Sequence, residues 1–304
     1  MNSEAHGSSA KAILYAFIAN LGIALSKTWA AFYTGSGSML AEAIHSYADS
    51  ANQVLLFLGL KQAQRPADAE HPLGYGKLSY FWSFIVALML FSVGGLFSIY
   101  EGFHKLELNE PLHKIWVGLL VLGVAIVLET LSLLGCLREI RKLRKQQSLR
   151  NWLKETRNAE LVVVFGEDIA ALVGLVLAFV ALGLAALTGN SIYDAIGSIA
   201  IGVVLIIVSI FIAIRIRSLL VGRSAEPRLQ RIIDDVINND EAFVELFNAI
   251  TIQFGPTVML AAKVRMAPGL SLTEAVQHIN ALEQRIKAEA PEIGWCFIEP
   301  DDRD

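Results

Sequence analysis

Two side chains that commonly bind metals, His45 and Asp49, stand four positions apart inside a long apolar stretch. In a helix, residues four apart lie one turn apart on the same face, so both can reach one ligand. An imidazole nitrogen and a carboxylate oxygen suit zinc, and also manganese, cobalt or iron(II). The pair falls short of the four donors of a tetrahedral site, so we expect further donors from another helix.

A second acidic pair, Glu167 and Asp168, lies in another apolar stretch and is the best source of those donors. A charge at the centre of a membrane helix costs about 2.5 to 3.5 kcal/mol on insertion scales, which makes such exceptions informative. The alternative is that His45 and Asp49 only tie two helices together by hydrogen bonds. Several carboxylates around one imidazole, however, need a cation or protons to neutralise them in a low dielectric.

The elements that must position these residues are membrane helices. The chain has 304 residues, a mean hydropathy of +0.51 and 18% charged residues, which predicts a polytopic α-helical membrane protein. Nothing in the charge pattern suggests binding of nucleic acid. Six stretches are long enough to cross a bilayer, at residues 12–32, 39–60, 80–100, 115–136, 161–182 and 195–214.

The loops between these stretches predict the orientation. The connection after the second stretch holds Lys61, Arg65 and Lys77, and the connection after the fourth is strongly basic between Arg138 and Arg157. By the positive-inside rule these loops and both termini face the cytoplasm. Topology and contact with anionic lipid explain the basic run without a specific partner. We expect a multi-pass protein of a bacterial inner membrane.

After Ser224 the sequence takes on soluble character. A helix is predicted over residues 227–239, strands over 249–254 and 258–266, a helix from the Ser271 capping box to about Ala290, and a strand over 294–298. This order predicts a small α+β domain with helices on one face of a sheet. The expected divisions are a cytoplasmic N-terminus (1–11), a six-helix transmembrane domain (12–214) and a cytoplasmic α+β domain (215–304).

Three motifs resemble the cation diffusion facilitator family. Residues 38–49 (SMLAEAIHSYAD) look like the family's second-helix motif, residues 71–77 (HPLGYGK) resemble the signature before its third helix, and residues 193–198 (YDAIGS) resemble the start of its sixth. Leu73 departs from the second motif, at a place that is usually aromatic. The resemblance covers nearly the whole chain and implies a homodimeric antiporter that exports zinc or related ions in exchange for protons, with a metallochaperone-like, ferredoxin-like cytoplasmic domain.

The resemblance implies a transport site of His45, Asp49 and Asp168. The family usually has a His or Asp four residues before the last of these, where this chain has Val164, which cannot bind a metal. Glu167 is the nearest substitute, although it lies about 100° around the helix from Asp168. Other candidates for the missing donor are amides, each of which can instead make an interhelical hydrogen bond: Asn20, Asn52 and Gln53.

A second metal site that some family members have in a loop is incomplete here, and the cytoplasmic domain offers residues for another. In the loop after the second stretch, Asp68 and His71 fit a second site, but Tyr75 occupies the position of its other His. We expect that site to be weak or absent. In the cytoplasmic domain His278, Glu299, Asp301 and Asp302 can bind a regulatory metal, or can simply form a solvated helix face and an acidic tail.

The expected mechanism is competition between metal and protons at one site. Ligation requires a neutral His and ionised carboxylates, so a bound cation expels protons. Transport then needs no ATP, and the sequence contains no phosphate-binding GxxxxGK[ST] run. Zinc is the first expected ion, with manganese, iron(II) and cobalt as alternatives. Two alternatives remain. One is an intramembrane metalloenzyme, although the absence of an HExxH motif argues against it. The other is a metal sensor that binds the ion without transporting it.

Overall fold

The computed structural model describes residues 20–108, 112–144 and 146–303. The expected cytoplasmic N-terminus (1–11) and the beginning of the first expected span (12–19) lie outside the described residues. The chain divides into two compact units. The first comprises residues 1–58, 82–145 and 160–215, and the second comprises residues 59–81, 146–159 and 216–304.

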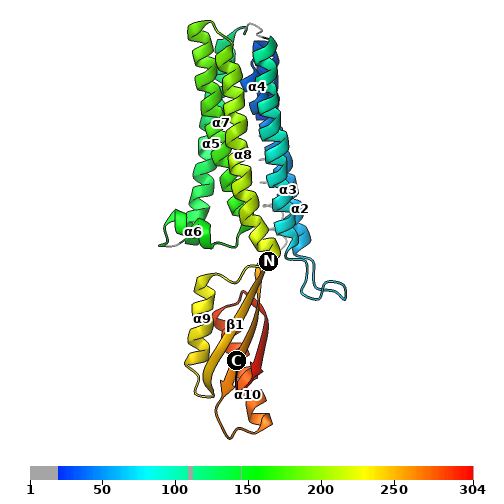
Figure 1. Ribbon diagram of the computed structural model, residues 1–304, viewed down its shortest axis with the longest axis vertical. Coiled ribbons are helices and arrows are strands. Elements are labelled where there is room, and N and C mark those ends of the chain that lie inside the picture. Colours follow the sequence, from blue (N-terminus) through cyan, green and yellow to red (C-terminus); the bar gives the residue numbers. More distant parts are fainter. Residues whose placement is uncertain (1–19, 109–111, 145, 304) are drawn as a thin grey trace, which may run out of the picture. The chain divides into compact units, whose positions relative to one another are not determined.

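The first unit is a bundle of long helices (Figure 1). They are a helix described from residue 20 to 34, α2 (Gly37–Ala63), α5 (Ile115–Arg144), α7 (Ala159–Thr188), α8 (Ile192–Val221), and one continuous helix formed by α3 (Leu78–Met89), η1 (Leu90–Leu96) and α4 (Phe97–Leu108). Four segments are long and apolar enough to cross a membrane: Leu78–Leu108, Ile115–Arg144, Ala159–Thr188 and Ile192–Val221. The protein is therefore an integral, multi-pass membrane protein.

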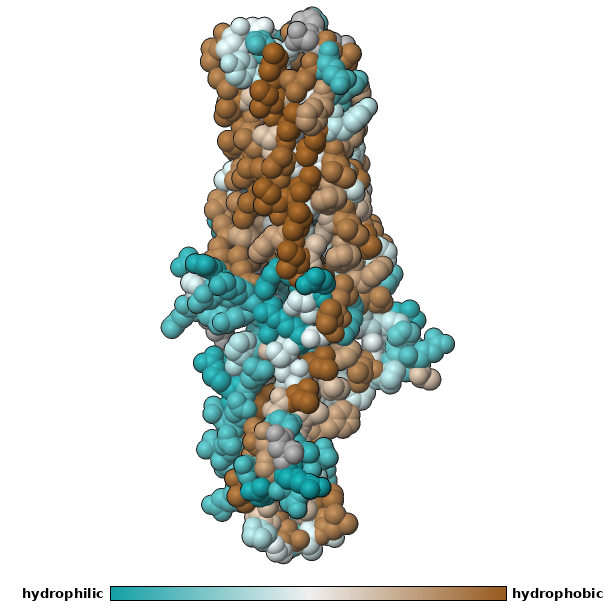
Figure 2. Space-filling view, in the orientation of Figure 1, coloured by the Kyte–Doolittle hydropathy of each residue, from teal (hydrophilic) through white to brown (hydrophobic). Residues whose placement is uncertain are grey.

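Apolar side chains cover the outside of these helices, as Figure 2 shows by the brown surface over them. Trp116, Leu131 and Ile207, for example, are each more than 60% exposed. In water such a surface would be strongly unfavourable, whereas in a bilayer it contacts lipid. The helices are also longer than predicted. The expected loop after the fourth span begins late, because α5 continues to Arg144 and carries Arg138, Arg141 and Lys142 on its last turns.

The π-helical segment η1 lies between α3 and α4 and contains Gly94 and Gly95. A Cβ placed on Gly95 would lie 2.6 Å from Ile206 Cγ1 and 3.3 Å from the carbonyl oxygen of Gly202 on α8. The two backbones therefore approach closely. π-Helical turns are rare and occur frequently at functional sites.

Asp194 at the beginning of α8 holds the beginning of α2, which the sequence analysis did not foresee. Asp194 is 1% exposed, and its carboxylate accepts hydrogen bonds from Ser36 Oγ (2.7 Å), the Gly37 amide (2.7 Å) and Ser38 Oγ. The first amides of a helix have no partner within the helix, so this carboxylate satisfies them from a neighbouring helix. The helix that carries His45 and Asp49 is thereby fixed at its first turn.

The second unit contains the predicted α+β domain. Its elements are α9 (Pro227–Asn238), β1 (Phe243–Phe254), β2 (Thr257–Met266), α10 (Leu272–Glu289) and β3 (Ile293–Pro300), in the predicted order. The sheet order is β1-β2-β3, with β1 antiparallel and β3 parallel to β2. Residues of both helices and all three strands form one core that includes Leu229, Ile233, Leu260, Leu282 and Ile286.

The strand β1 begins six residues earlier than the predicted Ala249. Its pairing with β2 is irregular between Phe243 and Glu245 and again between Leu246 and Asn248. Each irregularity shifts the alternation of inward and outward side chains, and that alternation is the signal from which a strand is read. The start of β1 therefore does not look like a strand in the sequence.

The basic segment before α7 is partly ordered into a short helix, α6 (Leu149–Glu155), which was expected to be loop. Arg157, which follows it, donates hydrogen bonds to the carbonyl oxygens of Ser224 (2.7 Å) and Ala225 (2.9 Å). Arg157 thus has a defined structural role within the basic run, because it connects residues 146–159 to the segment that leads into α9.

The connection between α2 and α3 contacts the turn between β1 and β2. The Tyr80 hydroxyl donates a hydrogen bond to the carbonyl oxygen of Gly255 (3.2 Å), and the Lys77 ammonium lies 4.7 Å from the centre of the Phe254 ring. A Cβ on Gly255 would lie 2.6 Å from the carbonyl oxygen of Gly76. The two glycines permit this approach because neither has a side chain.

Candidate metal transport site

His45 and Asp49 lie on one face of α2, as predicted, with His45 Nδ1 3.5 Å from Asp49 Oδ1. This distance is too long for a good hydrogen bond. His45 is fully buried, and neither of its ring nitrogens has a hydrogen-bond partner among the residues that the structure describes. A buried imidazole without a partner is costly, so this residue is available to a ligand or a proton.

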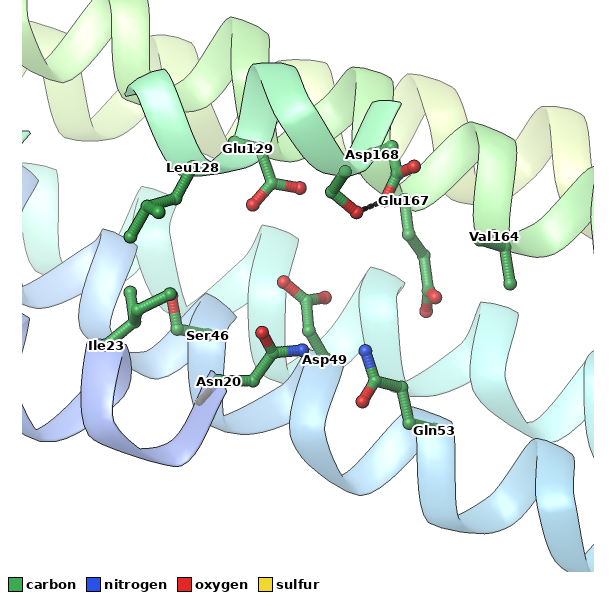
Figure 3. A pocket seen from close by; sticks show the side chains of 11 residues that line it. Asn20, Ile23, Ser46, Asp49, Gln53, Leu128, Glu129, Val164, Glu167 and Asp168 are labelled. Carbon is green, nitrogen blue, oxygen red and sulfur yellow. Dashed lines mark hydrogen bonds between the residues drawn. The ribbon is translucent and has the colours of Figure 1, made fainter. Parts of the chain in front are cut away.

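A cavity of about 320 Å³ opens beside Asp49 within the bundle (Figure 3). On one side its polar lining comes from the first helix and α2, through Asn20, Ser46, Asp49 and Gln53. On the other side it comes from α5 and α7, through Glu129, Ser132, Glu167 and Asp168. Figure 3 shows the carboxylates of Asp49, Glu129 and Asp168 directed into the same space. His45 does not line this cavity, but its Nδ1 lies 3.5 Å from Asp49 Oδ1, and Asp49 does line it.

The two acids of α7 have different partners. Glu167 Oε1 accepts a 2.6 Å hydrogen bond from Asn52 Nδ2, so Glu167 faces α2. Asp168 Oδ1 accepts a 3.3 Å hydrogen bond from Ser132 Oγ and so faces α5. The other oxygen, Asp168 Oδ2, is buried and has no hydrogen-bond partner within the described ranges. This divergence agrees with the angle of about 100° expected between adjacent residues of a helix.

The predicted gap in α7 is present, because Val164 contributes an apolar side chain to the cavity wall. Of the three candidate amides, Asn20 and Gln53 line the cavity, whereas Asn52 is fully buried and bound to Glu167. Within the part of the chain that the structure describes, no three His, Cys, Asp or Glu residues are close enough together to hold a metal ion. His45, Asp49 and Asp168 are thus neighbours around a cavity, and binding must draw its donors inward.

A buried ion pair adjoins the site. Lys27 Nζ lies 3.2 Å from Glu42 Oε2 and donates a 2.8 Å hydrogen bond to Ser46 Oγ. Both charged side chains are almost fully buried. Lys27 therefore pairs with another helix and does not extend toward the membrane surface, and Glu42 serves this pairing.

The expected loop site is closed by its own hydrogen bonds. The Tyr75 hydroxyl donates to Asp68 Oδ2 (2.7 Å), and the amides of His71 and Glu70 donate to Asp68 Oδ1 (2.8 and 3.1 Å). These bonds, that of Tyr75 most of all, lower the pKa of Asp68 below its ordinary value. The His71 ring packs on the Tyr75 ring with centroids 4.3 Å apart. Tyr75 thus satisfies the carboxylate that a metal would need.

The residues of the expected cytoplasmic-domain site have other contacts or are solvated. Asp301 Oδ2 lies 2.8 Å from Lys263 Nζ, and this interaction lowers the pKa of Asp301 to about 2. His278 lies exposed on α10, Glu299 lies exposed on β3, and the Asp302 amide donates to Asp301 Oδ1. Cys296 is buried in the core, and burial raises the pKa of its thiol to about 11, so it is a neutral core residue.

Glu129 and Ser132 are the site residues that the sequence analysis did not assign to the cavity. The sequence does show that Glu129 and Ser132 are three positions apart, which places a carboxylate and a hydroxyl on one face of α5. That spacing does not say which neighbouring helix the face meets.

A model of the cation efflux transmembrane domain matches residues 13–221 of this chain. The chain is 36% identical over 212 residues to the proton-coupled zinc antiporter SLC30A9, mitochondrial, of Xenopus laevis, covering 69% of this chain and 38% of that relative. It is 34% identical over 225 residues to metal tolerance protein C4 of Arabidopsis thaliana, covering 73% and 49%. It is 28% identical over 266 residues to the cation-efflux pump FieF of Pectobacterium atrosepticum, covering 87% and 83%.

The chain thus spans less than half the length of the first two of these relatives, and most of the length of the third. The matched family model covers more than half of the chain and includes every residue of the cavity. Its description agrees with the apolar helices, the buried acids of α2 and α7, and the motifs at residues 38–49 and 193–198. This chain therefore belongs to the cation efflux family, whose members are transporters and not enzymes.

Proposed function

We propose that the protein exports a divalent metal ion, zinc in the first place, from the cytosol in exchange for protons. The observation that carries this proposal is the cavity inside the membrane bundle, where Asp49, Glu167 and Asp168 meet beside the fully buried His45. Relatives named as proton-coupled zinc antiporters support both the ion and the coupling. Manganese, iron(II) and cobalt are the alternative ions for the same site.

Proton coupling follows from the donors themselves. His45 has two unpartnered nitrogens, and Asp49 and Asp168 each have an unpartnered buried oxygen. Such groups need a proton or a metal ion to offset burial, and a metal ion binds them only after their protons leave. If the cavity opens alternately to the two sides, each metal ion that moves outward is replaced by protons that move inward.

The proposed topology has six spans with both termini in the cytoplasm. The helix at residues 20–34 and α2 supply two spans in addition to the four apolar segments, and α2 is less hydrophobic because it carries the site. The basic residues at the end of α5 support a cytoplasmic location for that end. A bacterial inner membrane is the proposed location.

We also propose a homodimer. The outer face of the sheet in the second unit carries apolar side chains that the core does not use, among them Ile250 and Phe297, each more than half exposed. These residues lie on the two outer strands, β1 and β3, in register on either side of Ala261 of β2, since Ile250 pairs with Ala261 and Ala261 pairs with Phe297. A second copy of the chain would cover such a face. The mass of the purified protein in detergent, measured by light scattering, tests this.

The central test is metal flux in proteoliposomes with an internal metal-sensitive dye and an imposed pH gradient. We expect His45→Ala and Asp49→Ala to abolish metal uptake while the purified proteins keep their helical circular dichroism. Wild-type rates in both variants would reject the site. Competition among zinc, manganese, cobalt and iron(II) in the same vesicles identifies the preferred ion, and binding without flux would identify a sensor.

A further inference from the structure

The cavity contains one carboxylate for which the function described above has no use, that of Glu129 on α5. Glu129 lines the cavity together with Asp49 and Asp168. Ser132 lies one turn later on the same face of α5 and donates a 3.3 Å hydrogen bond to Asp168. The face of α5 that carries Glu129 therefore meets the acidic face of α7.

Three other acids in or beside the cavity have at least one partner each. Glu42 is paired with Lys27, Glu167 accepts from Asn52, and one oxygen of Asp168 accepts from Ser132. Glu129 has no hydrogen bond or ion pair to any residue in the described ranges, and Lys27, a buried cation of the bundle, is already engaged by Glu42 and Ser46. Among the described residues, Glu129 therefore has no cation with which it could form a structural ion pair.

The neighbours of Glu129 point to a ligand between them. Asp168 is 92% buried, and its unpartnered oxygen belongs to a side chain directed into the cavity, as is the unpartnered oxygen of Asp49 (Figure 3). Three carboxylates around a cavity that can admit an ion are stable only with a cation or protons among them. Figure 3 also shows Glu129 on the opposite side of Asp168 from Val164.

We propose that Glu129 is a metal ligand of the transport site and supplies the donor that Val164 cannot. This inference rests on the proposed function, because it concerns the same transported ion. The ion then lies between α2, α5 and α7, nearer to Asp49, Glu129 and Asp168 than to Val164. Oxygen donors outnumber the single imidazole of His45, so the site accepts oxygen-preferring ions such as Mn²⁺ as well as Zn²⁺.

Equilibrium binding of Zn²⁺ and Mn²⁺ to the purified full-length protein tests this, by competition with a metal-sensitive dye. We expect Glu129→Gln to lower the affinity for both ions by at least roughly tenfold, and Glu129→Asp to recover part of the loss. Glu129→His should restore Zn²⁺ binding more than Mn²⁺ binding, because imidazole suits zinc better. Glu139→Gln is the matched control, since Glu139 lies exposed on the same helix beside Lys142.

The visible spectrum of bound Co²⁺ distinguishes ligation from a general effect of charge. If Glu129 binds the ion, the spectrum at saturating Co²⁺ changes in Glu129→Gln and stays unchanged in Glu139→Gln. Wild-type affinity and an unchanged Co²⁺ spectrum in Glu129→Gln would overturn the inference while leaving the proposed function intact. Failure of the wild-type protein to bind any of these ions would instead overturn both.

Discussion

At the scale of single residues, the transport site combines groups that are satisfied with groups that are not. Asn52 fixes Glu167 and Ser132 fixes one oxygen of Asp168, whereas His45 and the second oxygen of Asp168 have no partner among the described residues. The groups that are hydrogen-bonded fix the geometry of the cavity wall. The buried groups without a hydrogen bond are stabilised when they bind an ion, which favours binding. This division is what a site needs if it must hold a metal ion and then release it.

The pair of Lys27 and Glu42 belongs to the satisfied part, and its removal should be costly. Lys27→Met leaves Glu42 buried without its cation, for which a loss of about 3–5 kcal/mol is typical. We expect a lower midpoint of thermal unfolding in detergent for Lys27→Met, and recovery of most of the loss in Lys27→Met combined with Glu42→Gln. A double variant no more stable than the single one would show that the two charges do not depend on each other.

The residue scale also shows what could be predicted from sequence. Three features each belong to a single helix and so follow from sequence alone. They are the spacing of His45 and Asp49, the free-energy cost of placing Glu167 and Asp168 in a membrane helix, and the missing metal donor at Val164. The partners Asn52 and Ser132, and the direction of Glu129, depend on how each helix is rotated against its neighbours. That rotation is set by packing among helices of similar hydrophobicity, which no local pattern encodes.

At the scale of elements, two contacts made by α8 order the helices around the site. Asp194 of α8 binds its first turn, and the glycines of η1 allow α8 to approach the continuous helix from α3 to α4. η1 lies close to the site as well, because a Cβ on Gly94 would lie 3.9 Å from His45 Nδ1. The glycines could be recognised from sequence as a close approach, but the π-helical geometry of η1 could not.

Gly95→Ala should therefore be destabilising, since its Cβ would meet Ile206 at 2.6 Å and the Gly202 carbonyl oxygen at 3.3 Å. Overpacking of this kind typically costs about 1–3 kcal/mol. Gly135→Ala on α5 is the control, because no other atom lies within 4 Å of the added Cβ and alanine favours the helix. Thermal unfolding in detergent compares them, and equal midpoints for the two variants would exclude a packing role for Gly95.

At the scale of the whole molecule, the continuity of the chain links the second unit to the helices of the first. The β1-β2 turn contacts residues 76–80, and α3 begins at Leu78 and continues through η1 to α4. The sequence predicted the two strands and the third span, but the contact between Gly76 and Gly255 joins positions far apart in the chain and required the structure.

Gly76→Ala tests whether transport uses this contact. The added Cβ would lie 2.8 Å from the carbonyl carbon of Phe254 and 3.2 Å from the amide nitrogen of Gly255, so the turn must move away. We expect a severalfold lower rate of metal flux in proteoliposomes, with equilibrium metal affinity unchanged because the cavity is not altered. Gly294→Ala on β3 is the control, since its nearest contact would be an ordinary 3.6 Å to Thr257. Wild-type flux in Gly76→Ala would show that the turn is only a structural support, whereas a parallel loss of affinity would mean that the cavity itself depends on it.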